Sequence, residues 1–204
     1  MSGKQEVDYK RVLGLQLPTD PRWVNMAEMD LEEILSDHAY CELKAATSCI
    51  SLIQQFPDRE ELVEEVSPVV TEEWGHFRQV LKEMKKRNLE LGLQRKDEYV
   101  NALLKFQRKG GSRDDRLLEK LLTCALIEAR SCERFRLLSL NIADDNLKEF
   151  YHKFMVSEAG HYKMFLALAR KYSGDEKALN RWNEYLEFEA DLMTKLEPRG
   201  DRMH

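Results

Sequence analysis

Four long segments of this 204-residue chain repeat apolar residues at helical spacing, and a glutamate interrupts each apolar line. The four are Glu42, Glu73, Glu128 and Glu158. An ionised carboxylate in an apolar core costs several kcal/mol unless a cation or hydrogen-bond donors pair with it. Most of the nine glycines and five prolines lie where the helical pattern stops. The sequence therefore predicts an all-α protein whose helices surround a polar centre.

The breaks in this pattern predict a single domain, residues 1–204, in three parts. Residues 1–28 lack periodicity and are expected to form an N-terminal arm. Residues 29–172 are expected to form a four-helix bundle, and residues 175–196 an additional C-terminal helix. About twenty residues of weak pattern, 92–112, separate the second helix of the bundle from the third. Such a length favours a long crossover rather than a turn between neighbouring helices.

Local signals predict where several helices begin and end. Asp58 and Glu61 have the spacing of a capping box ahead of the second helix. Pro68 predicts a kink or a break inside that helix. Ser112 stands where the third helix should begin, and Gly174 where the fourth should end.

Two of the buried glutamates begin a Glu-x-x-His motif, which places both side chains on one face of a helix. The motifs read EWGH, with Glu73 and His76, and EAGH, with Glu158 and His161. A third pair, Glu149 and His152, lies among charged residues and is expected to face solvent.

The spacing of the glutamates places them at one depth in the bundle. Glu42 lies 31 residues before Glu73, and Glu128 lies 30 residues before Glu158. A turn falls midway in each interval, so at about 1.5 Å per residue the two members of each pair reach similar heights in a helical hairpin. One Glu from each of two helices and a Glu-x-x-His from each of the others is the ligand set of di-iron and di-manganese bundles. The candidate metal ligands are Glu42, Glu73, His76, Glu128, Glu158 and His161.

Residues beside the motifs have two interpretations each. Glu133 and Arg134 either orient the ligands or form a surface ion pair. Gly75 and Gly160, in mid-helix, favour close helix approach over a channel for oxygen or substrate. Without metal, the buried Glu and His would have to satisfy one another or pair with arginine.

Charge is unevenly distributed along this chain of net charge -5. Residues 82–116 contain eleven Lys and Arg against six acids. The segment is either a solvated crossover or a surface for an anionic partner such as RNA. In the second interpretation the candidate RNA contacts are Lys85, Lys86, Arg87, Arg108, Lys109 and Arg113.

The remaining composition favours a cytoplasmic protein. The four cysteines form no Cys-x-x-Cys motif, which suits a reducing compartment. The N-terminal residues have no signal-peptide pattern, and no uncharged run reaches the roughly 20 residues that span a bilayer. We therefore expect no membrane insertion.

Five stretches of the sequence resemble the MiaE family, bacterial tRNA-(2-methylthio-N6-isopentenyl-adenosine) hydroxylases of ferritin-like fold. They are LPTDPRWV, SDHAYCELKAA, TEEWGHF, IEARSCERF and SEAGHYKMF, and the resemblance covers most of the chain. It implies the same six residues as ligands to two iron ions. It also implies oxygen-dependent hydroxylation of the isopentenyl group on an adenosine beside the tRNA anticodon. No flavin or nucleotide motif is visible, so a separate reductase would supply the electrons.

Within this reading, Glu73 and Glu158 are expected to bridge the two irons, with Glu42 and Glu128 as terminal ligands. Two other functions remain open from the residues alone. One is a ferroxidase or peroxidase of the ferritin and rubrerythrin type. The other is a metal-free helical RNA-binding module.

Overall fold

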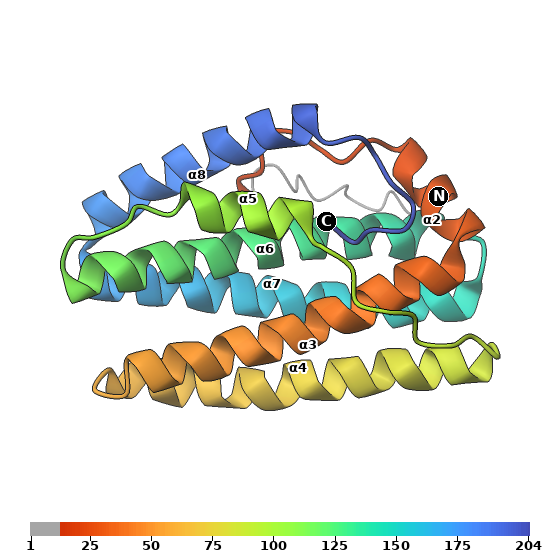
Figure 1. Ribbon diagram of the computed structural model, residues 1–204, viewed down its shortest axis with the longest axis horizontal. Coiled ribbons are helices and arrows are strands. Elements are labelled where there is room, and N and C mark those ends of the chain that lie inside the picture. Colours follow the sequence, from red (N-terminus) through yellow and green to blue (C-terminus); the bar gives the residue numbers. More distant parts are fainter. Residues whose placement is uncertain (1–12) are drawn as a thin grey trace, which may run out of the picture.

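The computed structural model describes residues 13–204, which contain seven helices, labelled α2 to α8 in Figure 1. They are α2 (Arg22–Met29), α3 (Leu31–Gln55), α4 (Glu60–Lys86), α5 (Glu98–Phe106), α6 (Arg113–Asn141), α7 (Asp145–Ser173) and α8 (Asp175–Lys195). The expectation of an all-α fold is confirmed. Within the described range, no helix combines the length and apolar character needed to cross a bilayer.

Four of the helices form a bundle of two antiparallel hairpins, α3 with α4 and α6 with α7 (Figure 1). Helices α4 and α6 run in the same direction, so the chain between them must return along the bundle. One long connection of this kind is the ferritin-like arrangement, and the expected crossover is confirmed.

The crossover is partly helical, which the weak sequence pattern did not reveal. Helix α5 lies within it and has Asp97 as its N-cap, whose side chain accepts a hydrogen bond from Val100 N at 2.9 Å. It buries Tyr99 and Leu103, one turn apart. A helix of nine residues with two core positions gives too short a pattern to detect.

The helix ends follow their local chemistry in two of the expected places. Ser112 caps α6 in a capping box, and Gly174, with φ of 82°, ends α7 in a backbone region that favours glycine. The capping box at Asp58 is wrong: α4 has Arg59 at its N-cap, and Asp58 pairs with Arg113 at 2.5 Å. The predicted break at Pro68 is also wrong, because α4 continues through it.

The expected N-terminal arm, residues 1–28, includes α2; residues 1–12 lie outside the described part. A buried arginine, Arg130 on α6, ties this arm to the rest of the molecule. Its guanidinium donates to Leu17 O at 2.9 Å and, through Nε, to Glu189 Oε1 of α8 at 2.8 Å. The arm and the additional helix are thus fastened to the same helix of the bundle.

The apolar core has two parts, one toward each end of the bundle. One contains Leu126 and Phe165, and the other contains Phe135 and Phe154. On α7, Glu158 lies between Phe154 and Phe165, so the polar centre lies where the two apolar parts meet.

Candidate metal centre

The structure brings the six candidate ligands together in two overlapping groups of buried side chains. One group is Glu42, Glu73, His76 and Glu158, and the other is Glu73, Glu128, Glu158 and His161. Within each group, one potential ligand atom per residue lies within 4.8 Å of the others. Glu73 and Glu158 belong to both groups, as residues shared by two adjacent metal ions would.

The two imidazoles point Nδ1 into the carboxylates. His76 Nδ1 lies 3.3 Å from Glu42 Oε2, and His161 Nδ1 lies 2.8 Å from Glu73 Oε1. Neither Nδ1 atom makes a hydrogen bond of acceptable geometry, and the same holds for Glu73 Oε1 and Glu158 Oε1. Buried polar atoms in proteins almost always have partners. These convergent oxygen and imidazole donors therefore fit a pair of divalent metal ions.

Without metal, protons supply the positive charge in the cluster. Burial raises the pKa of Glu42 and of Glu128 well above the usual range, and a neighbouring glutamate raises each further. Burial alone would lower the pKa of His76 and His161. Contacts with Glu42 and Glu73 instead raise the pKa of His76 to about 10, and contacts with Glu158 and Glu73 raise that of His161 to about 11.

Two further residues contact the cluster from outside. Glu72 Oε2 lies 2.8 Å from Nε2 of His161, and a carboxylate there holds the ring with Nδ1 facing inward. His38 Nε2 lies 2.7 Å from Glu42 Oε1, and burial lowers the pKa of His38 well below its usual range, so this ring is neutral. Neither residue was among the predicted ligands. Both could have been found from their positions in the sequence, since His38 precedes Glu42 by one helical turn and Glu72 adjoins Glu73.

Neither interpretation of Glu133 and Arg134 holds. Glu133 accepts hydrogen bonds from Thr19 N at 2.9 Å and Thr19 Oγ1 at 2.6 Å, and Arg134 donates to Arg202 O at 3.3 Å. Both side chains hold the arm and the chain after α8 rather than orient the cluster. With relative exposures of 8% and 5%, they are not a surface ion pair either.

The prediction of close helix approach at Gly75 and Gly160 is also wrong. A Cβ added to either glycine would meet no atom within 4 Å. Open space therefore lies beside both Glu-x-x-His motifs.

A small apolar cavity adjoins the cluster. Its volume is about 70 Å³, and all four glutamates line it, whereas His76 and His161 do not. Its other walls include Ala45, Ile127 and Phe165. A cavity on the carboxylate side of the cluster with apolar walls suits a hydrocarbon group.

The candidate RNA contacts do not form one surface. Lys85 and Lys86 end α4 and Arg113 begins α6, and these helix ends lie at opposite ends of the bundle (Figure 1). The 27 residues of α4 span about 40 Å. A single docking patch built from the segment 82–116 is therefore wrong, because the crossover runs along the bundle and separates its two ends.

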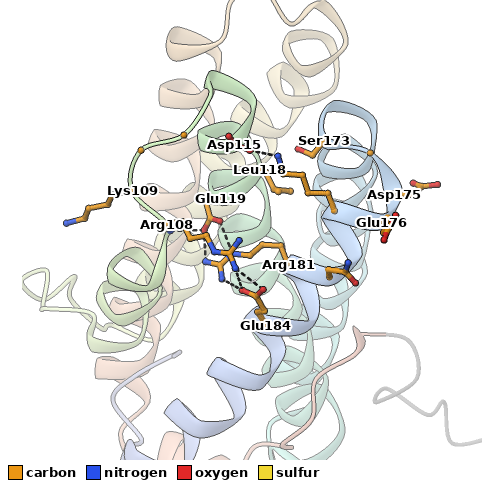
Figure 2. Close-up of a pocket in the computed structure, with 15 residues that line it drawn as sticks. Arg108, Lys109, Asp115, Leu118, Glu119, Ser173, Asp175, Glu176, Arg181 and Glu184 are labelled. Carbon is orange, nitrogen blue, oxygen red and sulfur yellow. Dashed lines mark hydrogen bonds and ion pairs between the residues drawn. The ribbon is translucent and has the colours of Figure 1, made fainter.

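Acidic partners also neutralise most of these cations. Arg108 pairs with Glu184 at 2.7 Å, in a pocket where Arg181 also contacts Glu119 (Figure 2). At the other end, Arg87 pairs with both Glu83 and Asp144 at 2.9 Å.

Comparison with known proteins identifies the family. Residues 7–204 match the family model described as "MiaE: tRNA-(MS[2]IO[6]A)-hydroxylase (MiaE)". The chain belongs to the MiaE family. A tRNA 2-(methylsulfanyl)-N(6)-isopentenyladenosine(37) hydroxylase of Pseudomonas putida is 38% identical over 167 residues, 82% of this chain and 80% of the relative. The hydroxylase of the same name from Salmonella typhimurium is 30% identical over 228 residues, covering 88% of this chain and 83% of the relative.

A solved structure shows that this MiaE-family fold also serves another oxygenase. "Protein 43 with aldehyde deformylating oxygenase activity from Synechococcus" superposes with a TM-score of 0.87 at 33% sequence identity. The match covers 93% of this chain and 94% of that one. The ferritin-like fold is thereby confirmed, and the bundle alone does not determine the reaction.

Proposed function

We propose that this chain hydroxylates the isopentenyl group of 2-methylthio-N6-isopentenyl-adenosine in tRNA, with two iron ions as its cofactor and dioxygen as co-substrate. Membership of the MiaE family supports the reaction and the tRNA substrate. The observation that carries the chemistry is the convergence of four glutamates and two histidines at one buried place. An enzyme that modifies tRNA in this way works in the cytoplasm.

The ligand assignment follows from the two overlapping groups. Glu73 and Glu158 would bridge the irons because both belong to each group. Glu42 and His76 would complete the coordination of one iron, and Glu128 and His161 would complete that of the other. Four carboxylates balance the four positive charges of two ferrous ions.

Two iron ions at this site supply the two-electron activation of dioxygen that hydroxylation of a C–H bond requires. In the overall reaction, the C–H bond and O₂ take up two electrons and two protons to give an alcohol and water. A separate reductase would deliver the electrons. The chain's own residues orient the ligands and exclude water. Glu72 holds His161, the neutral His38 ring lies against Glu42, and the apolar cavity would hold the prenyl methyl group beside the carboxylates.

The apolar cavity favours this function over a ferroxidase or a peroxidase. Ala45, Ile127 and Phe165 line it and give a hydrocarbon group apolar contacts, which neither an iron ion nor hydrogen peroxide would need as substrate. The unpartnered polar atoms in the cluster count against a metal-free RNA-binding module.

Expression in a bacterial strain whose tRNA carries the unhydroxylated nucleoside tests the proposal. Nucleoside analysis should show a new species heavier by one oxygen atom with the parent chain and with Glu149→Ala. Glu128→Ala should give none, since it removes one of the four cluster carboxylates. Unchanged nucleosides in cells that contain folded, iron-loaded parent would refute the function.

A further inference from the structure

The chain after α8 closes one wall of the cavity beside the cluster. Among the residues that line this cavity, only Asp97 and His204 lie outside helices. His204 Nε2 lies 2.9 Å from Ser131 Oγ, and its ring stacks on Tyr99 with centroids 5.3 Å apart. At about 70 Å³, the cavity is too small for a five-carbon group followed by an adenine. Its walls must therefore shift to make room for the substrate.

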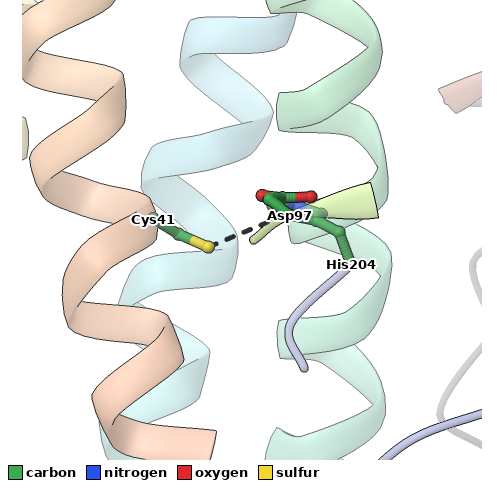
Figure 3. Close-up of side chains that lie close together, drawn as sticks. All are labelled: Cys41, Asp97 and His204. Atoms are coloured by element: carbon green, nitrogen blue, oxygen red, sulfur yellow. Dashed lines mark hydrogen bonds and ion pairs between the residues drawn. The ribbon is translucent and has the colours of Figure 1, made fainter. Parts of the chain in front are cut away.

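The meeting of Cys41, Asp97 and His204 in this wall is not a second metal site (Figure 3). The ammonium of Lys44 lies 2.5 Å from Asp97 Oδ2 and already neutralises that carboxylate. Burial raises the pKa of the Cys41 thiol well above its usual range, so it is a poor ligand. The three side chains instead close this wall of the cavity, where α3, the residue before α5 and the chain after α8 meet.

Outside this wall lies a groove of about 930 Å³, and His204 lines both spaces. The groove runs between the arm, the start of α5 and the chain after α8, which Figure 1 shows turning back toward α5. His204 is thus the side chain that separates an open surface groove from the catalytic cavity.

The groove is basic in a protein that is acidic overall. Its cationic side chains are Arg22, Lys96, Arg134, Lys195, Arg199 and Arg202, against the three acids Asp20, Glu98 and Glu197. Arg22, Lys195 and Arg199 are each more than half exposed; Asp20, Asp191 and Asp201 pair with them, and of these acids only Asp20 lines the groove. The pocket with Arg108 at the other end of the bundle has more acidic than basic side chains. Charge complementarity with a phosphate backbone therefore favours the groove beside His204 over the pocket with Arg108.

We propose that this groove is the docking surface for the anticodon loop, and that the modified adenosine reaches the cavity by displacing His204. The proposal rests on the tRNA hydroxylase function above. RNA-binding proteins commonly take unstacked loop bases and stack them on aromatic rings. Displacing His204 uncovers the face of Tyr99, which can then stack on the adenine.

Salt-dependent tRNA binding tests the docking surface. Lys96→Ala/Arg199→Ala removes two exposed cations of the groove, and Arg108→Ala/Lys109→Ala is the matched control at the far end. With about 0.7 to 0.9 lost per phosphate contact, the slope of log affinity against log salt should fall by roughly 1.4 to 1.8 in the groove variant only. The ratio of tRNA turnover to isolated nucleoside turnover should also fall in that variant. An unchanged slope there, or an equal fall in the control, overturns the docking surface.

A second variant tests the closure. In His204→Ala the nucleoside no longer has to displace an imidazole, so its KM should fall several-fold while the salt slope of tRNA binding stays at the parent value. A KM that is unchanged or higher overturns the role of His204. If the iron-loaded parent hydroxylates neither tRNA nor nucleoside, the proposed function itself fails. If the parent is active but the groove variant and His204→Ala both behave like the parent, the docking proposal fails and the proposed function stands.

Discussion

Metal loading of the cluster should release at least two protons for each pair of divalent ions bound. At neutral pH His76 and His161 are protonated, because contacts with Glu42, Glu73 and Glu158 raise their pKa values to about 10 and about 11. Metal ions bind the neutral imidazole, so they must displace both protons. Burial also raises the pKa of Glu42 and of Glu128, so any proton on either carboxyl adds to this number.

The sign of the pH dependence follows directly. Below the raised pKa values, every proton is a competitor of the metal, and the apparent affinity must increase as the pH rises. Each displaced proton contributes about 1.4 kcal/mol per pH unit, so the two imidazole protons make binding of the ion pair about 3 kcal/mol more favourable per unit near pH 7.

Calorimetric titration with ferrous ion, without oxygen and in buffers of different ionisation enthalpy, counts these protons. Glu42→Gln removes a carboxylate whose contact raises the pKa of His76, so it should release fewer protons than the parent. Glu149→Gln alters an exposed glutamate that pairs with Lys153 and should release the parent number. Release of one proton or none by the parent, or the same number from Glu42→Gln as from the parent, would refute this account of the cluster.

Three further predictions concern residues around the site. Arg130→Met leaves the fully buried Glu189 without its cation and should lower the free energy of unfolding in urea by about 3 to 5 kcal/mol. The double variant Arg130→Met/Glu189→Met should restore most of this loss, and a single variant as stable as the parent would contradict the buried ion pair. Glu72→Gln should weaken iron binding about tenfold in competition with a chelator, because His161 loses its carboxylate partner, and parent affinity would contradict that role. Gly75→Ala and Gly160→Ala should each raise stability by about 1 kcal/mol, since the added methyl meets open space, and a loss of stability would reveal a steric contact.

The cluster could be anticipated from sequence because a helix has a fixed rise per residue. Nearly equal intervals, 15 residues from Glu42 to the turn at Pro57 and 16 on to Glu73, place two carboxylates at one height before any tertiary contact is known. Helix ends were predictable at Ser112 and Gly174 for a similar reason, since capping involves only neighbouring residues. Asp58 was misjudged because a distant partner, Arg113, takes its carboxylate.

Features that depend on distant segments could not be read from the pattern. The basic groove joins residues 17–23, 96–99 and 193–202, and no periodicity encodes their meeting. The reverse error arose at the segment 82–116, whose charges are close in sequence but lie at opposite ends of the bundle. His38 shows an intermediate case: it stands one helical turn before Glu42 in the sequence, but that spacing alone does not show the contact between their side chains.

The most direct test of the central claim is a single turnover of the reduced, iron-loaded protein with oxygen-18 gas and unhydroxylated tRNA. Mass spectrometry of the nucleosides should show one oxygen-18 atom in the isopentenyl group for the parent and none for Glu128→Ala or His161→Ala. Oxygen derived from water in the product would contradict the account, as would equal product from the parent and the two cluster variants.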